Sequence, residues 1–230
     1  MALILNLETA TAVCSVAVSR DGNVLQQLNA SGERAHASQL TTLITQCLQQ
    51  TGVAFADLDA VAVSNGPGSY TGLRIGISTA KGICYAADKP LITVGTLEAM
   101  ASGWYAQHPN QEVLVCPMID ARRMEVYTAV YSHALDNVMP VQALVLDDSA
   151  FAGLPKDQKV VFLGDGMPKA KTTLSGFHGA LFDDHYTPSA AGVALRAEVL
   201  FLRGDLEDLS SAGPFYLKEF RTTAQKKGMI

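Results

Sequence analysis

The chain has 230 residues, 48% of them hydrophobic, so it can bury a sizeable core as one large domain or as two of about 100 residues each. Its net charge of -5 argues against a free-standing nucleic-acid-binding protein, which usually presents a basic face. The four cysteines lie far apart and form no C-x-x-C pair. The sequence therefore suggests buried free thiols in a reducing compartment rather than a zinc site or a disulfide framework.

The first residues are apolar but lack the basic segment of a signal peptide, so they are better interpreted as a strand. No apolar run approaches the length of a membrane span. We therefore expect a cytoplasmic protein without a membrane segment.

The first half of the chain alternates apolar runs typical of strands with the wider apolar spacing typical of helices. The predicted strands are 2–7, 12–19, 24–28, 59–63 and 91–94, and the predicted helices are 35–50, 70–87 and 96–107. This order predicts a mixed sheet with helices packed over it.

The stretch from Ser64 to Gly76, with the sequence SNGPGSYTGLRIG, connects one of these strands to a helix. Gly66 and Gly68 allow a close approach of the backbone, and Ser69 is a good N-cap for a helix whose free N–H groups could bind an anion. The spacing matches neither a Walker loop, nor G-x-G-x-x-G, nor a nucleophile elbow. Two interpretations stay open locally, a phosphate or partner contact and an ordinary strand-to-helix connection.

Small residues recur every fourth position on the helix that follows, at Gly72, Gly76 and Ala80. Each glycine costs about 1 kcal/mol of helix propensity, so packing or binding must offset the loss. We predict that this strip faces outward as an interface with another helix. The predicted interface residues are Gly72, Leu73, Arg74, Gly76, Ala80 and Ile83.

The second half begins as the first does, with an apolar strand that ends at an acid, Asp120 here and Glu8 in the first half. The predicted strands are 113–119, 124–131, 141–146, 160–163 and 180–182, with a short helix at 148–153 and a longer one after Ser189 that ends near 203. This repetition predicts an α/β fold of two related lobes, residues 1–107 and residues 108–230. Part of the C-terminal segment is expected to complete the first lobe.

Several separate stretches resemble one family. They are LETAT at 7–11, RAHASQL at 34–40, NGPGSYTGLRIG at 65–76, VGTLE at 94–98, IDAR at 119–122 with EVY at 125–127, and FYL at 215–217. The family is that of the bacterial TsaB (YeaZ) proteins, relatives of TsaD in the actin/Hsp70/sugar-kinase (ASKHA) fold.

The resemblance implies a role in the threonylcarbamoyladenosine (t6A) modification of tRNA. In that family TsaD transfers the threonylcarbamoyl group, and TsaB binds TsaD and supports the reaction without catalysing it. It also implies a TsaE-family ATPase in the larger complex, a homodimer when the chain is alone, and tRNA contact only through the complex.

The catalytic features of TsaD-like relatives look reduced here. Thr96 and Met100 stand where those relatives carry a metal-binding H-x-x-x-H pair, and the five histidines offer no other metal spacing. The late Gly-Gly loop is also missing, since residues 189–193 hold a single glycine. We therefore expect no metal and no catalytic residue, and at most weak binding of ATP or ADP without hydrolysis by this chain alone.

Some residues could still contact a nucleotide or anion as remnants of the nucleotide site of this fold. These are Glu8, Thr9, Gly66, Gly68, Asp120 and Arg122. Glu8 and Asp120 are more simply interpreted as acids that cap turns. His36 is more simply interpreted as a local hydrogen-bonding residue, Arg74 as an interface or salt-bridge residue, and Arg122 is open between a contact and an anion clamp.

Two alternatives belong to other function classes. One is an active kinase or ATPase of the same fold, with Glu8 and Asp120 around a magnesium-bound phosphate. The other is a peptidase, which no nucleophile–base pair and no zinc spacing supports.

Overall fold

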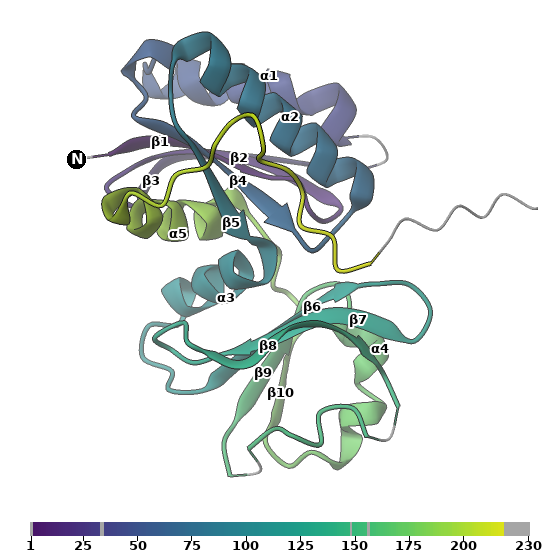
Figure 1. The fold of residues 1–230 in the computed structure, drawn as a ribbon. Helices are drawn as coiled ribbons and strands as arrows, with labels where there is room; N and C mark the ends of the chain where they lie inside the picture. The colour runs from purple at the N-terminus through teal and green to yellow at the C-terminus, as the bar shows by residue number, and fades with distance from the viewer. Residues whose placement is uncertain (1, 33–34, 148, 156, 219–230) are drawn as a thin grey trace, which may run out of the picture.

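The computed structural model describes residues 2–32, 35–147, 149–155 and 157–218. Within them the chain folds around two five-stranded mixed sheets, drawn one above the other in Figure 1. We call the first sheet with its covering helices the first lobe and the second sheet with its helices the second lobe.

The first sheet has the order β3-β2-β1-β4-β5, with β1, β2 and β3 antiparallel and β1, β4 and β5 parallel. Leu3, Leu5 and Leu7 of β1 point to one face, where α1 and α2 cover them, and Ile4 points to the other face, beneath α5. The alternation follows from the two-residue period of a strand buried on both faces. The elements are β1 (Leu3–Glu8), β2 (Val13–Arg20), β3 (Asn23–Ser31), α1 (Ala35–Thr51), η1 (Phe55–Asp57), β4 (Ala60–Gly66), α2 (Tyr70–Ala87), β5 (Leu91–Gly95) and α5 (Ala190–Arg203).

The second sheet repeats this topology in the order β8-β7-β6-β9-β10, again with three antiparallel strands followed by two parallel pairings. Helix α3 covers the face turned toward the first lobe, and α4 with η2 covers the other. The elements are α3 (Thr96–Gln107), β6 (Leu114–Asp120), β7 (Glu125–Tyr131), β8 (Asn137–Val145), β9 (Val160–Leu163), α4 (Met167–Ala170), η2 (Thr173–Gly176) and β10 (Ala180–Asp183). The predicted fold of two related α/β lobes is confirmed, while the exact boundary between residues 107 and 108 stays a prediction.

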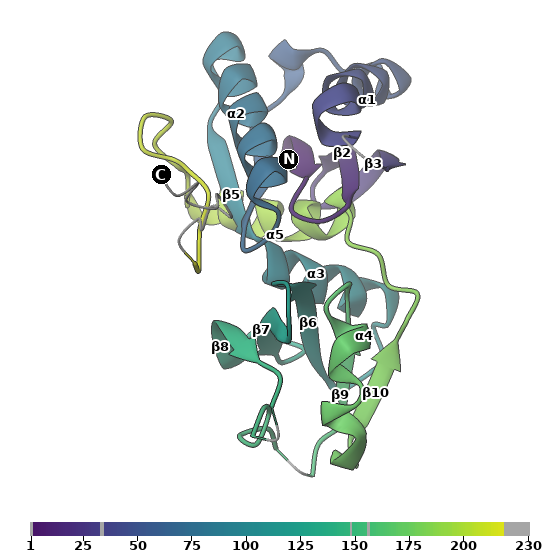
Figure 2. The ribbon, with the colours of Figure 1, turned by 90° about the vertical axis from the view of Figure 1, so that its right-hand side faces the viewer.

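Helices α3 and α5 form the close contact between the lobes. A side chain at Gly192 would collide with the carbonyl of Ala99, so the two backbones approach as only glycine allows. Arg196 of α5 pairs with Glu98 of α3 at 2.7 Å. Figure 2 shows both helices between the two sheets.

The element predictions failed mainly between β7 and α5. Residues 149–153 form turns instead of the predicted short helix, because Phe151 has a left-handed φ of 67° that a helix cannot contain. Position 148 lies outside the described residues. Strand β8 begins at Asn137 rather than at residue 141, and α4 and η2 lie in a stretch without a clear pattern. All four cysteines are buried and free, as predicted.

Candidate functional site

The turn between β1 and β2 packs directly on the turn that leads into α2. The Ser69 amide donates to the Ala10 carbonyl at 2.7 Å, and the Ser69 hydroxyl accepts from the Gly72 amide at 3.2 Å, which caps the helix as predicted. A side chain at Gly68 would collide with Ala10 and one at Gly72 with the Thr9 carbonyl. The glycines therefore allow one turn of this chain to approach another.

The predicted outward strip on α2 is wrong in its direction. Gly72, Gly76 and Ala80 are buried in the chain itself, and a side chain at Gly76 would overlap the Thr9 hydroxyl. Leu73 is also fully buried, and Ile83 packs against the core of the first lobe. The strip is smooth because β1 and its turn lie against it. Of the six predicted interface residues, only Arg74 is exposed.

Glu8 ends β1 with its side chain turned into the protein, 1% exposed. Its carboxylate accepts a 2.6 Å hydrogen bond from the Ala10 amide. Burial raises the pKa of Glu8 to about 7, against the lowering effect of the hydrogen bonds from Ala10 and from the Ser64 hydroxyl. Glu8 thus holds its own turn, as the turn-cap interpretation expects. Thr9 beside it is fully buried, and its hydroxyl has no hydrogen-bond partner among the described residues.

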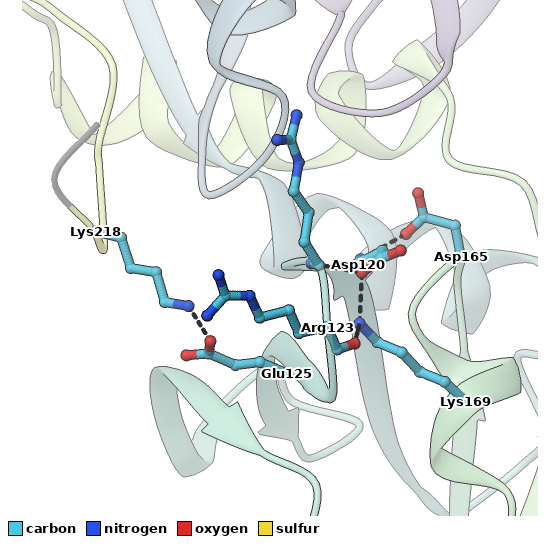
Figure 3. A network of polar contacts seen from close by, with 7 residues as sticks. Asp120, Arg123, Glu125, Asp165, Lys169 and Lys218 are labelled. Atoms are coloured by element: carbon cyan, nitrogen blue, oxygen red, sulfur yellow. Dashed lines mark hydrogen bonds and ion pairs between the residues drawn. The ribbon is translucent and has the colours of Figure 1, made fainter. Parts of the chain in front are cut away.

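The turn between β6 and β7 carries an acid that is already paired. Asp120 accepts from the Arg122 amide at 2.7 Å and forms an ion pair with Lys169 of α4, while its own amide donates to Asp165 at 3.0 Å (Figure 3). Burial raises the pKa of Asp120, but the bonds from Lys169 and the Arg122 amide outweigh it, so the net shift is downward. Burial raises the pKa of Asp165.

Two arginines extend this turn. Arg122 and Arg123 have left-handed φ angles of 67° and 51°, which are uncommon for residues with a side chain. Both are exposed, and neither guanidinium forms an ion pair within the described part of the chain.

The β6–β7 turn faces the β1–β2 turn and the turn before α2 across a cleft of about 1170 Å³, which we call the interlobe cleft. Its walls are residues 10–12, 67–71, 119–123 and 215–218, with contributions from single residues. His36 lines the cleft, and its Nε2 lies 3.2 Å from the Val13 carbonyl oxygen, a local contact as expected.

The interlobe cleft gathers only part of the predicted anion-binding set. Gly68, Asp120 and Arg122 line it, whereas Glu8, Thr9 and Gly66 are buried beneath its surface. The sequence interpretation missed Lys169, because α4 has no clear pattern, and Arg123. It also missed the contacts of Tyr216, although the FYL motif marked that stretch.

The two positions that replace the histidine pair are closed off. The Thr96 hydroxyl accepts from the Gly66 amide at 3.1 Å, and Met100 is 1% exposed in the core beside Gly164. Neither side chain reaches the cleft. Among the described residues, no group of three or more histidines, cysteines or acids could hold a metal ion. No described helix is long and apolar enough to cross a membrane.

Two mixed sheets with repeated topology and facing turns define the class of the actin-like ATPases and sugar kinases, the ASKHA fold. The family model described as TsaD, tRNA N6-adenosine threonylcarbamoyltransferase, matches residues 24–191. The structure of YeaZ from Pseudomonas aeruginosa has a TM-score of 0.81 at 28% identity, over 94% of this chain and 100% of that chain.

Curated relatives agree with that structural neighbour. The tRNA threonylcarbamoyladenosine biosynthesis protein TsaB of Bacillus subtilis is 30% identical over 94% of this chain and 93% of its own length. The TsaB protein of Escherichia coli is 41% identical over 56% of this chain and 54% of its own length. The chain belongs to the TsaB (YeaZ) family.

Proposed function

We propose that this chain is a partner subunit of the t6A machinery that binds a TsaD-type protein and supports threonylcarbamoyl transfer without catalysing it. The family and its named relatives support the assignment to t6A biosynthesis. The observation that carries the non-catalytic role concerns the positions where catalytic relatives hold functional groups. In this chain, the side chains at those positions are buried or bonded to the chain's own backbone. Thr96 and Met100 are buried, and Glu8 holds its own turn.

The partner surface is the outer face of α1 and α2. The Thr9 turn packs against the inner face of α2, so the outer side of the helix is the one available to a partner. Tyr85 on that side is 85% exposed, and an exposed tyrosine ring is of the kind enriched at protein interfaces. The same face would serve a homodimer when TsaD is absent. A TsaE-type ATPase and tRNA would join only in the larger complex.

A binding experiment tests this surface. Tyr85→Ala should weaken association with a TsaD-type protein in analytical ultracentrifugation and reduce self-association of the chain alone. Leu202→Ala is the matched control, because Leu202 is 73% exposed on α5, away from α1 and α2. Unchanged association in Tyr85→Ala would count against the proposed face.

A reconstituted reaction tests the role itself. We expect t6A formation on tRNA to require this chain together with its TsaD-type partner, and Asp120→Asn to leave the rate nearly unchanged. A loss of transfer in Asp120→Asn with TsaD binding intact would contradict a purely supporting role.

One observation favours the alternative that this chain binds a nucleotide. Arg122 and Arg123 face the interlobe cleft opposite the N-terminus of α2, and two guanidinium groups can bind a phosphate. The acids do not fit a magnesium-bound phosphate, because Glu8 is buried and Asp120 is paired with Lys169, so we derive no transfer step. Weak ATP or ADP binding should therefore be insensitive to magnesium in calorimetry and lost in Arg122→Ala. Tight magnesium-dependent binding with turnover would favour the kinase alternative.

A further inference from the structure

The lobes are joined firmly on one side of the interlobe cleft. There α3 and α5 pack backbone to backbone at Gly103 and Gly192. The Tyr186 hydroxyl donates to the Met100 carbonyl at 2.7 Å and ties the segment before α5 to α3. A contact of this kind can act as a hinge, since it fixes one edge and leaves the other free to open.

A second connection runs along the chain after α5. The segment crosses the edge of the first sheet, where the Glu207 amide donates to the Leu91 carbonyl at 2.9 Å, and passes α2, where Lys81 donates to the Ala212 carbonyl at 2.9 Å. It then descends toward the second lobe at the side away from α5 (Figure 1). Residues 215–218 form part of the wall of the interlobe cleft.

The end of this segment is fixed to the first lobe at α2. The Phe215 amide donates to the Asn65 carbonyl at 2.7 Å. The Tyr216 ring stacks on Tyr70 with centroids 5.0 Å apart, and the Arg74 Nε donates to the Tyr216 hydroxyl at 3.0 Å. The Arg74 guanidinium carbon also lies 4.1 Å from the centre of the Tyr70 ring, so the three side chains form one cluster.

Two residues further on, the same segment reaches the second lobe. Lys218 forms an ion pair with Glu125 at the start of β7 (Figure 3). Its Nζ also lies 5.9 Å from the centre of the Tyr127 ring. Both partners of this ion pair are partly exposed, so the contact is weak enough to break.

We propose that residues 214–218 are a releasable strap that holds the interlobe cleft at its present width opposite the α3–α5 hinge. The tyrosine–arginine cluster is the fixed end, and the Lys218–Glu125 ion pair is the end that opens. Release of Lys218 lets the second lobe swing away and widens the cleft. This inference is independent of the proposed function, because it concerns the distance between the lobes and not what binds there.

Pulsed electron–electron double resonance, which measures the distance between two spin labels, tests the strap on the full chain. Cysteines replace Leu25 on β3 and Val138 on β8, both exposed, and carry the spin labels, while the four native cysteines are buried. Lys218→Glu should lengthen the mean distance and broaden its distribution. The double variant Lys218→Glu with Glu125→Lys should restore the original distribution, which a general loss of folding would not do.

The fixed end is tested in the same way. Tyr216→Ala should also lengthen and broaden the distance distribution, and Leu202→Ala, a loss of an exposed large side chain on α5, should not. A chain that ends at Gly213 should behave as Tyr216→Ala, and one that ends at Lys218 as the full chain. Distributions that stay unchanged in Lys218→Glu and in the chain ending at Gly213 would overturn the proposal.

Discussion

Gly76 of α2 lies directly against the hydroxyl of Thr9, the residue that follows β1. The contact leaves no room for a side chain at residue 76, and it buries the Thr9 hydroxyl without a hydrogen-bond partner among the described residues. The first turn of the chain is therefore locked under α2. The small-residue strip thus packs inside the first lobe and contributes to its stability rather than to contact with a partner.

Replacing Gly76 tests this relationship. Gly76→Leu should lower the free energy of unfolding by about 1–3 kcal/mol or more, because the added side chain forces Thr9 and β1 away from α2. Chemical denaturation measures the change. Gly82→Ala is the matched control on the same helix: a Cβ there meets no atom within 4 Å, so this variant should gain about 0.5–1 kcal/mol. A Gly76→Leu protein that has normal stability but no longer self-associates would instead support the outward-facing interface predicted from the sequence.

Glu8 makes stability depend on pH. Its pKa rises from 4.5 in the unfolded chain to about 7 in the folded protein, so the folded state binds more protons between these values. The stabilising effect is complete below pH 4.5 and is lost as the pH rises through 7, by an amount on the order of 3 kcal/mol. The free energy of unfolding should therefore fall between pH 5 and pH 8.

The variant Glu8→Gln isolates this effect. A neutral amide keeps an oxygen that can accept from Ala10 but cannot ionise, so the fall between pH 5 and pH 8 should shrink and stability at pH 8 should rise. Glu112→Gln, a matched change at an exposed position, should leave the pH profile as it is. If Glu8→Gln instead destabilises the protein at pH 8, the hydrogen bonds that the ionised carboxylate accepts outweigh the cost of burying its charge, which contradicts the predicted pH dependence.

Much of the fold could be predicted because strand and helix periods are local. The alternation of β1 and the spacing in α1 appear in the sequence, and the acids at Glu8 and Asp120 mark the same point of a repeated unit. The direction of the Gly72–Ala80 strip could not be predicted, since a smooth helix face looks the same whether its own chain or a partner covers it. The pairing of Lys169 with Asp120 joins residues 49 positions apart and leaves no local signal.

The Tyr216 hydroxyl should be coupled energetically to Arg74, whose guanidinium also lies over the Tyr70 ring. In a double-mutant cycle with Arg74→Ala and Tyr216→Phe, we expect the two effects to be non-additive, because the Arg74 Nε donates to the Tyr216 hydroxyl at 3.0 Å on the exposed surface. The cycle is measured by the rate of limited proteolysis at the C-terminal segment. Strictly additive effects would mean that the two side chains are neighbours without a shared interaction.

The α3–α5 contact should tolerate less change than any exposed glycine. Gly192→Ala places a methyl group against the Ala99 carbonyl, which forces the two helices apart and disturbs the Arg196–Glu98 ion pair beside it. We expect a loss of about 1–3 kcal/mol in the free energy of unfolding. Gly176→Ala is the control, since a Cβ there meets nothing within 4 Å and should cost little. Thermal unfolding compares the two variants, and equal midpoints would mean that α5 shifts to accommodate the methyl group without loss.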